Sequence, residues 1–74
     1  MKENNILVGM MAIYGALKEY HSGVLDKEVF ARSILALVKF AKNNDLVDTK
    51  LGKMLVFVIE KEDLMTWAEE NYQN

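Results

Sequence analysis

Few side chains in this sequence could carry out covalent or acid–base chemistry: it has one histidine, His21, two serines, Ser22 and Ser33, and no cysteine. Nucleophilic catalysis requires a nucleophile and a base within hydrogen-bonding distance of each other. His21 and Ser22 are neighbours in the chain, but adjacency alone does not create that geometry. A simpler interpretation places His21 at the C-terminal end of a helix, where the helix dipole favours it and solvent reaches it. These residues predict a protein that is not an enzyme, with no catalytic residue and no cofactor.

Carboxylates gather near the C-terminus, where residues 60–74 hold five of them against one lysine. Their spacing does not match the alternating oxygen ligands and central glycine of a calcium loop, and a structural zinc site needs Cys and His, so we expect no metal site. Two aromatic residues with a polar atom lie among these acids. An aromatic anchor surrounded by carboxylates suits docking on a basic protein surface. The predicted partner-binding residues are Glu60, Glu62, Asp63, Trp67, Glu69, Glu70 and Tyr72.

Four lysines, Lys39, Lys42, Lys50 and Lys53, flank a predicted turn at residues 43–45. A protein that reads DNA would have more arginine and a polar recognition helix, whereas the segment that follows this turn is apolar. The net charge of −2 also gives no general attraction to nucleic acid. A small DNA-binding or transcription regulator is therefore an alternative, and we expect the lysines to form a solvated rim.

Apolar residues at three- and four-residue spacing predict an all-α fold, a small bundle of three to four helices that forms one domain over residues 1–74. The first helix is expected over residues 4–20, with Gly9 and Gly15 allowing a neighbouring helix to approach closely. The sequence Ser22-Gly23 is a typical helix stop. The second helix is expected over residues 27–42, with Asp26 as its N-cap.

The segment Lys53–Ile59 is ambiguous. Residues Met54–Ile59 form a continuous apolar run rich in β-branched residues, and periodicity does not separate a buried helix from a buried strand there. We favour a helix that Asp48 or Thr49 caps. The alternative is a strand, and its partner would have to come from a second subunit. A last helix is expected to begin with Asp63 as N-cap and to run to Tyr72, or else to continue the third helix.

The chain has 74 residues, of which 51% are hydrophobic, and no disulfide to stabilise them. A chain this small buries its apolar surface most simply against a second copy, so we expect a homodimer. The lack of cysteine fits a reducing compartment, the cytoplasm. Residues 4–17 are uncharged, but they fall short of the roughly 20 residues of a membrane span. No basic cluster precedes them as in a signal peptide, so we expect a buried helix.

The stretch Lys53-Met54-Leu55-Val56-Phe57 has the apolar pattern of clamp-binding peptides, which read Gln-Leu-x-Leu-Phe. Met54, Val56 and Phe57 occupy the matching positions, while Lys53 replaces the glutamine. In length, acidity and absence of catalytic residues, the whole chain resembles the small phage-encoded inhibitors of the bacterial DNA polymerase sliding clamp found in large staphylococcal phages. The resemblance implies a protein in the host cytoplasm that binds the clamp and blocks host replication.

The resemblance also implies a second mode of binding, which we prefer. The central channel of the clamp is lined with positive charge because it holds DNA. A compact domain that presents the carboxylates of residues 60–74 would occupy the channel in place of the DNA phosphates. A structural or assembly protein that oligomerises through residues 54–59 is a further alternative.

Overall fold

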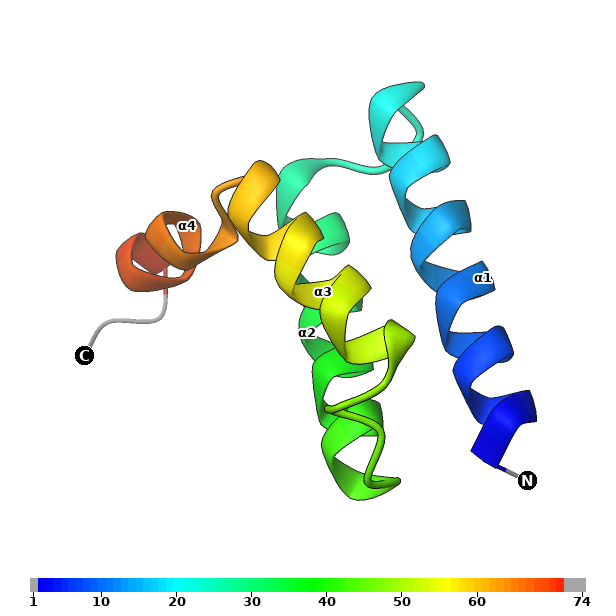
Figure 1. Cartoon of the computed structure of the whole chain (residues 1–74). Coiled ribbons are helices and arrows are strands. Elements are labelled where there is room, and N and C mark those ends of the chain that lie inside the picture. Colours follow the sequence, from blue (N-terminus) through cyan, green and yellow to red (C-terminus); the bar gives the residue numbers. More distant parts are fainter. Residues whose placement is uncertain (1, 72–74) are drawn as a thin grey trace.

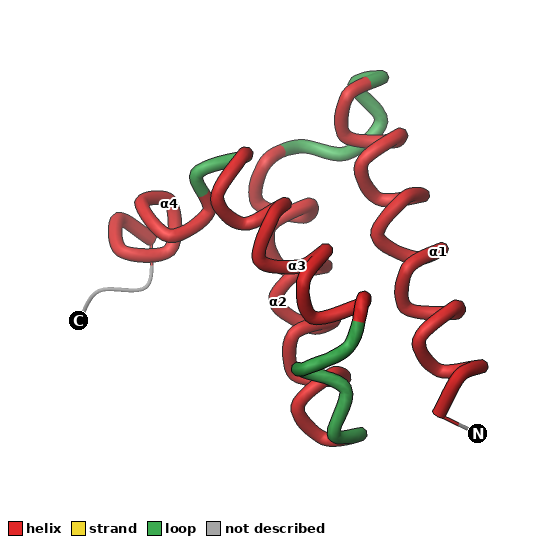
Figure 2. Tube along the Cα trace, in the orientation of Figure 1, coloured by secondary structure: helices red, strands yellow, loops and turns green. Residues whose placement is uncertain are grey.

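The structure is a computed structural model that describes residues 2–71, and it consists of four helices joined by short loops (Figures 1 and 2). The helices are α1 (Lys2–His21), α2 (Lys27–Asn43), α3 (Lys50–Lys61) and α4 (Leu64–Asn71). No strand occurs within residues 2–71. The predicted all-α fold is therefore confirmed, and the strand alternative for residues 53–59 is wrong.

The helix ends follow the local sequence. Asp26 caps α2, because its side chain accepts a hydrogen bond from the Val29 backbone N–H at 2.9 Å. Of the two caps considered for α3, the structure uses Thr49, whose hydroxyl accepts from the Leu51 N–H at 3.2 Å. The chain leaves α1 through Gly23, whose φ is +86°, and leaves α2 through Asp45 at φ +58°. Both predicted turns are thus present.

The first three helices pack against one another in pairs, and α4 packs on α3. Figure 1 shows α1, α2 and α3 side by side, with α4 projecting from the end of α3. The tightest aromatic contact closes one end of the bundle, where Tyr20 of α1 stacks on Phe30 of α2 with ring centroids 4.4 Å apart. The core is apolar and almost completely shielded from solvent: Ile13, Phe30, Ala31, Ile34, Ala41, Leu46, Leu51, Leu55, Val58 and Leu64.

Two glycines allow the close approaches that hold α3 in place. A Cβ atom at Gly9 would lie 2.6 Å from the tip of the Leu51 side chain, so α1 and α3 approach each other so closely there that a larger residue would displace that side chain. A Cβ atom at Gly52 would overlap the Val47 backbone carbonyl. Gly15 differs, because nothing lies within 4 Å of the position its Cβ would take. The predicted close approach is therefore confirmed at Gly9, and at Gly15 no described residue makes one.

Candidate functional site

The outer side of α3 presents an apolar pair within a charged surface. The buried residues Leu55 and Val58 fix the rotation of the helix, so Val56 and Phe57 between them turn outward and are 55% and 62% exposed. The Lys61 ammonium lies 6.0 Å from the centre of the Phe57 ring. This arrangement leaves two large apolar side chains in water beside solvated charges.

The structure does not bring the three predicted clamp-peptide residues together. Met54 is half-buried and packs against the core, whereas Val56 and Phe57 point away from it. Because residues 50–61 are helical, the side chain at position 56 leaves the backbone nearly opposite to the one at position 54, while position 57 lies one turn after position 54. Lys53–Phe57 is therefore not presented as a single binding stripe.

The Glu62 side chain is mostly covered by its contacts within the bundle, so it adds little to the open acidic surface. Its carboxylate lies 3.1 Å from the His21 imidazole Nε2, and only 13% of its side chain is exposed. The backbone carbonyl of the same residue accepts a hydrogen bond from the Lys27 ammonium at 3.0 Å. Glu62 thus joins the end of α3 to the end of α1 and the start of α2. The prediction that it contacts a partner does not fit this placement.

Asp63 forms the corner between α3 and α4. It stands directly before α4, as predicted, but its φ of +56° is left-handed and not the extended backbone that N-cap residues typically adopt. What begins α4 is the Asp63 backbone carbonyl, which accepts a hydrogen bond from the Trp67 N–H at 3.3 Å. This corner also separates α4 from α3, so α4 is not a continuation of the third helix.

The remaining predicted binding residues divide between the core and the surface. Trp67 is half-buried and packs against the core, so only part of its ring is open to a partner. Glu60, Glu69 and Glu70 are exposed, as is Met65, which the sequence pattern did not indicate. Tyr72 lies outside the described residues. We define the α3–α4 outer surface as the exposed residues Val56, Phe57, Glu60, Met65, Glu69 and Glu70.

The groups considered for catalysis make separate local contacts. The Ser22 hydroxyl donates to the Glu19 carbonyl at 3.2 Å, whereas the neighbouring His21 is bonded to Glu62. The Ser33 hydroxyl donates to the Val29 carbonyl at 2.8 Å, one turn earlier in its own helix. Within residues 2–71, no group of three His, Asp or Glu side chains is arranged to hold a metal ion.

The four lysines flanking the loop after α2 are all exposed: Lys39, Lys42, Lys50 and Lys53.

Over the described residues, no helix has the combination of length and apolar character required to cross a bilayer. The apolar residues of α1 are not all buried: its outer side exposes several of them, which include Met11 and Tyr14. The signal was present in the sequence, because apolar residues occur on every side of that helix.

Comparisons of the chain with protein-family models, with curated proteins and with solved structures gave no match.

Proposed function

We propose that this chain is a non-enzymatic cytoplasmic protein, of the kind that phages encode, which binds a protein of a bacterial host and blocks its action. The α3–α4 outer surface makes the contact, and the DNA polymerase sliding clamp is the first candidate target. The observation that carries the proposal is the exposed pair Val56 and Phe57 on a helix whose neighbouring segment bears exposed carboxylates.

The surface has the two parts that a protein-binding site requires. Large apolar residues supply most of the binding free energy when a partner covers them, and Phe57 is 62% exposed before binding. The carboxylates of Glu60, Glu69 and Glu70 lie in the exposed segment that follows, and charges at a rim steer association and select the partner. A basic target such as a DNA channel would be attracted to this segment.

The acidic part of the surface is smaller than the sequence suggests. Glu62 is bonded to His21, which leaves Glu60, Glu69 and Glu70 as the exposed glutamates of the segment beside the corner residue Asp63. An imitation of DNA by charge alone would therefore depend on few groups. In our proposal Phe57 and Met65 add apolar contact to the electrostatic attraction, so binding persists in part when salt screens the charges.

The first test reverses the charge of α4 in the variant Glu69→Lys/Glu70→Lys. Its matched control is Glu28→Lys/Asp48→Lys, which changes the net charge equally at exposed positions outside the surface. Affinity for purified sliding clamp is measured by surface plasmon resonance at low and moderate salt, after circular dichroism confirms that both variants are folded. We expect the α4 variant to lose affinity about tenfold or more and the control to lose little. Equal losses in the two variants, or an affinity indifferent to salt, would contradict the acidic contact.

The apolar part is tested by Phe57→Ala. Phe57 is exposed, so its removal costs the fold little, while the loss of a covered aromatic anchor typically weakens binding by about 2 kcal/mol or more. Val29→Ala, which shortens an exposed apolar residue on α2, is the control. Unchanged affinity in Phe57→Ala would exclude the outer side of α3. Absence of clamp binding by the unaltered protein would exclude this target.

A further inference from the structure

The first helix is apolar on the side that faces away from the core as well as on the side that faces it. Its inner side contributes Ile13, which is fully buried. Its outer side carries four large apolar residues that are more than half exposed: Leu7 at 57%, Val8 at 60%, Met11 at 64% and Tyr14 at 64%. A helix that is apolar nearly all round is normally buried on both sides. In the described residues, nothing covers the outer side of α1.

These residues form one ordered face. At about 100° of rotation per residue, Met11 lies at its centre, Leu7 and Tyr14 follow one edge, and Val8 and Gly15 follow the other. Asn4 and Lys18 close the two ends of the same face with polar side chains. We define the outer face of α1 as Leu7, Val8, Met11, Tyr14 and Gly15.

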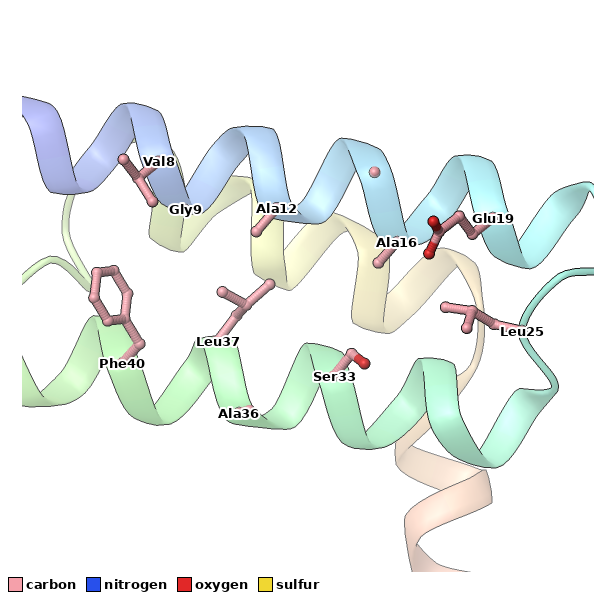
Figure 3. A pocket seen from close by; sticks show the side chains of 11 residues that line it. Val8, Gly9, Ala12, Ala16, Glu19, Leu25, Ser33, Ala36, Leu37 and Phe40 are labelled. Atoms are coloured by element: carbon pink, nitrogen blue, oxygen red, sulfur yellow. The ribbon is translucent and has the colours of Figure 1, made fainter.

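Gly15 gives a second and independent observation. Glycine inside a helix costs about 1 kcal/mol relative to alanine, and at Gly15 no contact among residues 2–71 requires it, because none of their atoms lies within 4 Å of its Cβ position. Beside it runs an open apolar groove of about 660 Å³ between α1 and α2. Figure 3 shows Val8, Ala12 and Ala16 of α1 facing Leu37 and Phe40 of α2 across this groove. The apolar surface therefore continues from α1 onto α2.

We infer that the outer face of α1 binds the same face of a second copy, with the two α1 helices antiparallel about a twofold axis at Met11. A twofold interface must be complementary to itself, since each patch meets its own copy. The order of residues satisfies this condition. The two Met11 side chains meet at the axis, Leu7 of each copy lies opposite Tyr14 of the other, and Val8 lies over the open space at Gly15.

The charges at the ends of α1 favour the antiparallel orientation, and they favour a second copy of the chain over a lipid surface as the binding partner of this face. In the antiparallel pair, Glu3 of one copy comes beside Lys18 of the other at both ends, and both residues are exposed. In a parallel pair the same residues would meet their own kind, which costs free energy. A helix that rests on a lipid surface typically has several Lys and Arg around its apolar face, whereas Asn4 and Lys18 are the polar residues of this face. The inference is independent of the proposed function, which concerns α3 and α4.

The first experiment measures the mass of the full chain in solution by sedimentation equilibrium over micromolar concentrations. Met11→Glu places two like charges at the axis, and Met65→Glu is its control on α4 because the two methionines are almost equally exposed, at 64% and 62%. We expect the unaltered chain and Met65→Glu to dimerise alike, and Met11→Glu to dimerise about a hundredfold more weakly, since like charges in contact cost several kcal/mol. A monomeric unaltered chain would overturn the inference, as would a Met11→Glu variant that dimerises normally.

Cross-linking tests the orientation, and the absence of cysteine from the natural sequence makes it specific. Met11→Cys is expected to form a disulfide-linked dimer under mild oxidation, whereas Met65→Cys is not. When Leu7→Cys and Tyr14→Cys proteins are mixed, antiparallel helices give the mixed 7–14 dimer in excess over the 7–7 dimer. An excess of the 7–7 species would overturn the antiparallel arrangement. Efficient cross-linking of Met65→Cys together with none at position 11 would move the interface away from α1.

Discussion

The inner and outer sides of α1 each carry a glycine, one in a packed contact and the other facing open space. On the inner side, Gly9 lies against Leu51 of α3, whose side chain is completely buried. On the outer side, Gly15 faces open space next to the exposed residue Met11. The fold of one copy therefore accounts for Gly9 and not for Gly15. Glycine lowers helix stability at each of these positions, so replacement by alanine distinguishes a glycine that packing within the fold requires from one that it does not. Gly52 of α3 is a third position for this test, and packing restricts it more strongly than Gly9.

The largest effect is expected for Gly52→Ala. The added Cβ would overlap the backbone carbonyl of Val47, and backbone cannot move aside as a side-chain tip can. The loop that carries the buried Leu46 would have to shift, so we expect a loss of more than about 3 kcal/mol in the free energy of unfolding. Urea unfolding followed by circular dichroism measures it. A variant as stable as the natural chain would show that the α2–α3 loop adapts easily.

Gly9→Ala is expected to be milder, with a net loss of about 1 kcal/mol. The new methyl group meets the ends of the Leu51 side chain, and overpacking of this kind costs about 1–3 kcal/mol, while alanine returns about 1 kcal/mol of helix propensity. The measurement is a double-mutant cycle with Leu51→Val, which removes the tips that clash. We expect Leu51→Val to cost less in the Gly9→Ala background than in the natural chain. Additive effects would mean that the two residues are not coupled.

Local features of the fold were predictable from the sequence. Apolar spacing and the cap at Asp26 gave the extent of α2, and the inward residues Phe30, Ile34 and Ala41 are buried as a helix of that rotation requires. The choice of helix for residues 53–59 depended on the absence of a second strand-like segment, which is also a property of the sequence. Leu46 is buried in a loop, where no periodicity marks it.

The candidate site was less predictable because contacts between distant residues decide it. Glu62 reads as one more surface acid, yet it pairs with His21, 41 residues away in the chain. Met54 and Val56 read as one motif, yet the helix turns them to nearly opposite sides. Exposure of Phe57 depends on how α3 rotates against α1 and α2, and that rotation is fixed by the burial of Leu55 and Val58. Sequence patterns identified the residue types of the surface but not which of them remain free for a partner.

Gly15→Ala should have the smallest effect and the opposite sign. Because no atom of the described residues occupies the space above Gly15, alanine should stabilise the isolated fold by up to about 1 kcal/mol, which corresponds to a rise in Tm of about 4–8 °C for a domain of this size. In the dimer that we infer, the same methyl group would enter the space that Val8 of the other copy would fill. Dimerisation stabilises the folded state more as concentration rises. The advantage of Gly15→Ala over the natural chain should therefore be greatest in dilute solution and shrink or reverse in concentrated solution, as differential scanning fluorimetry over a dilution series would show. An advantage that stays constant with concentration would mean that the outer face of α1 does not approach a second copy at Gly15.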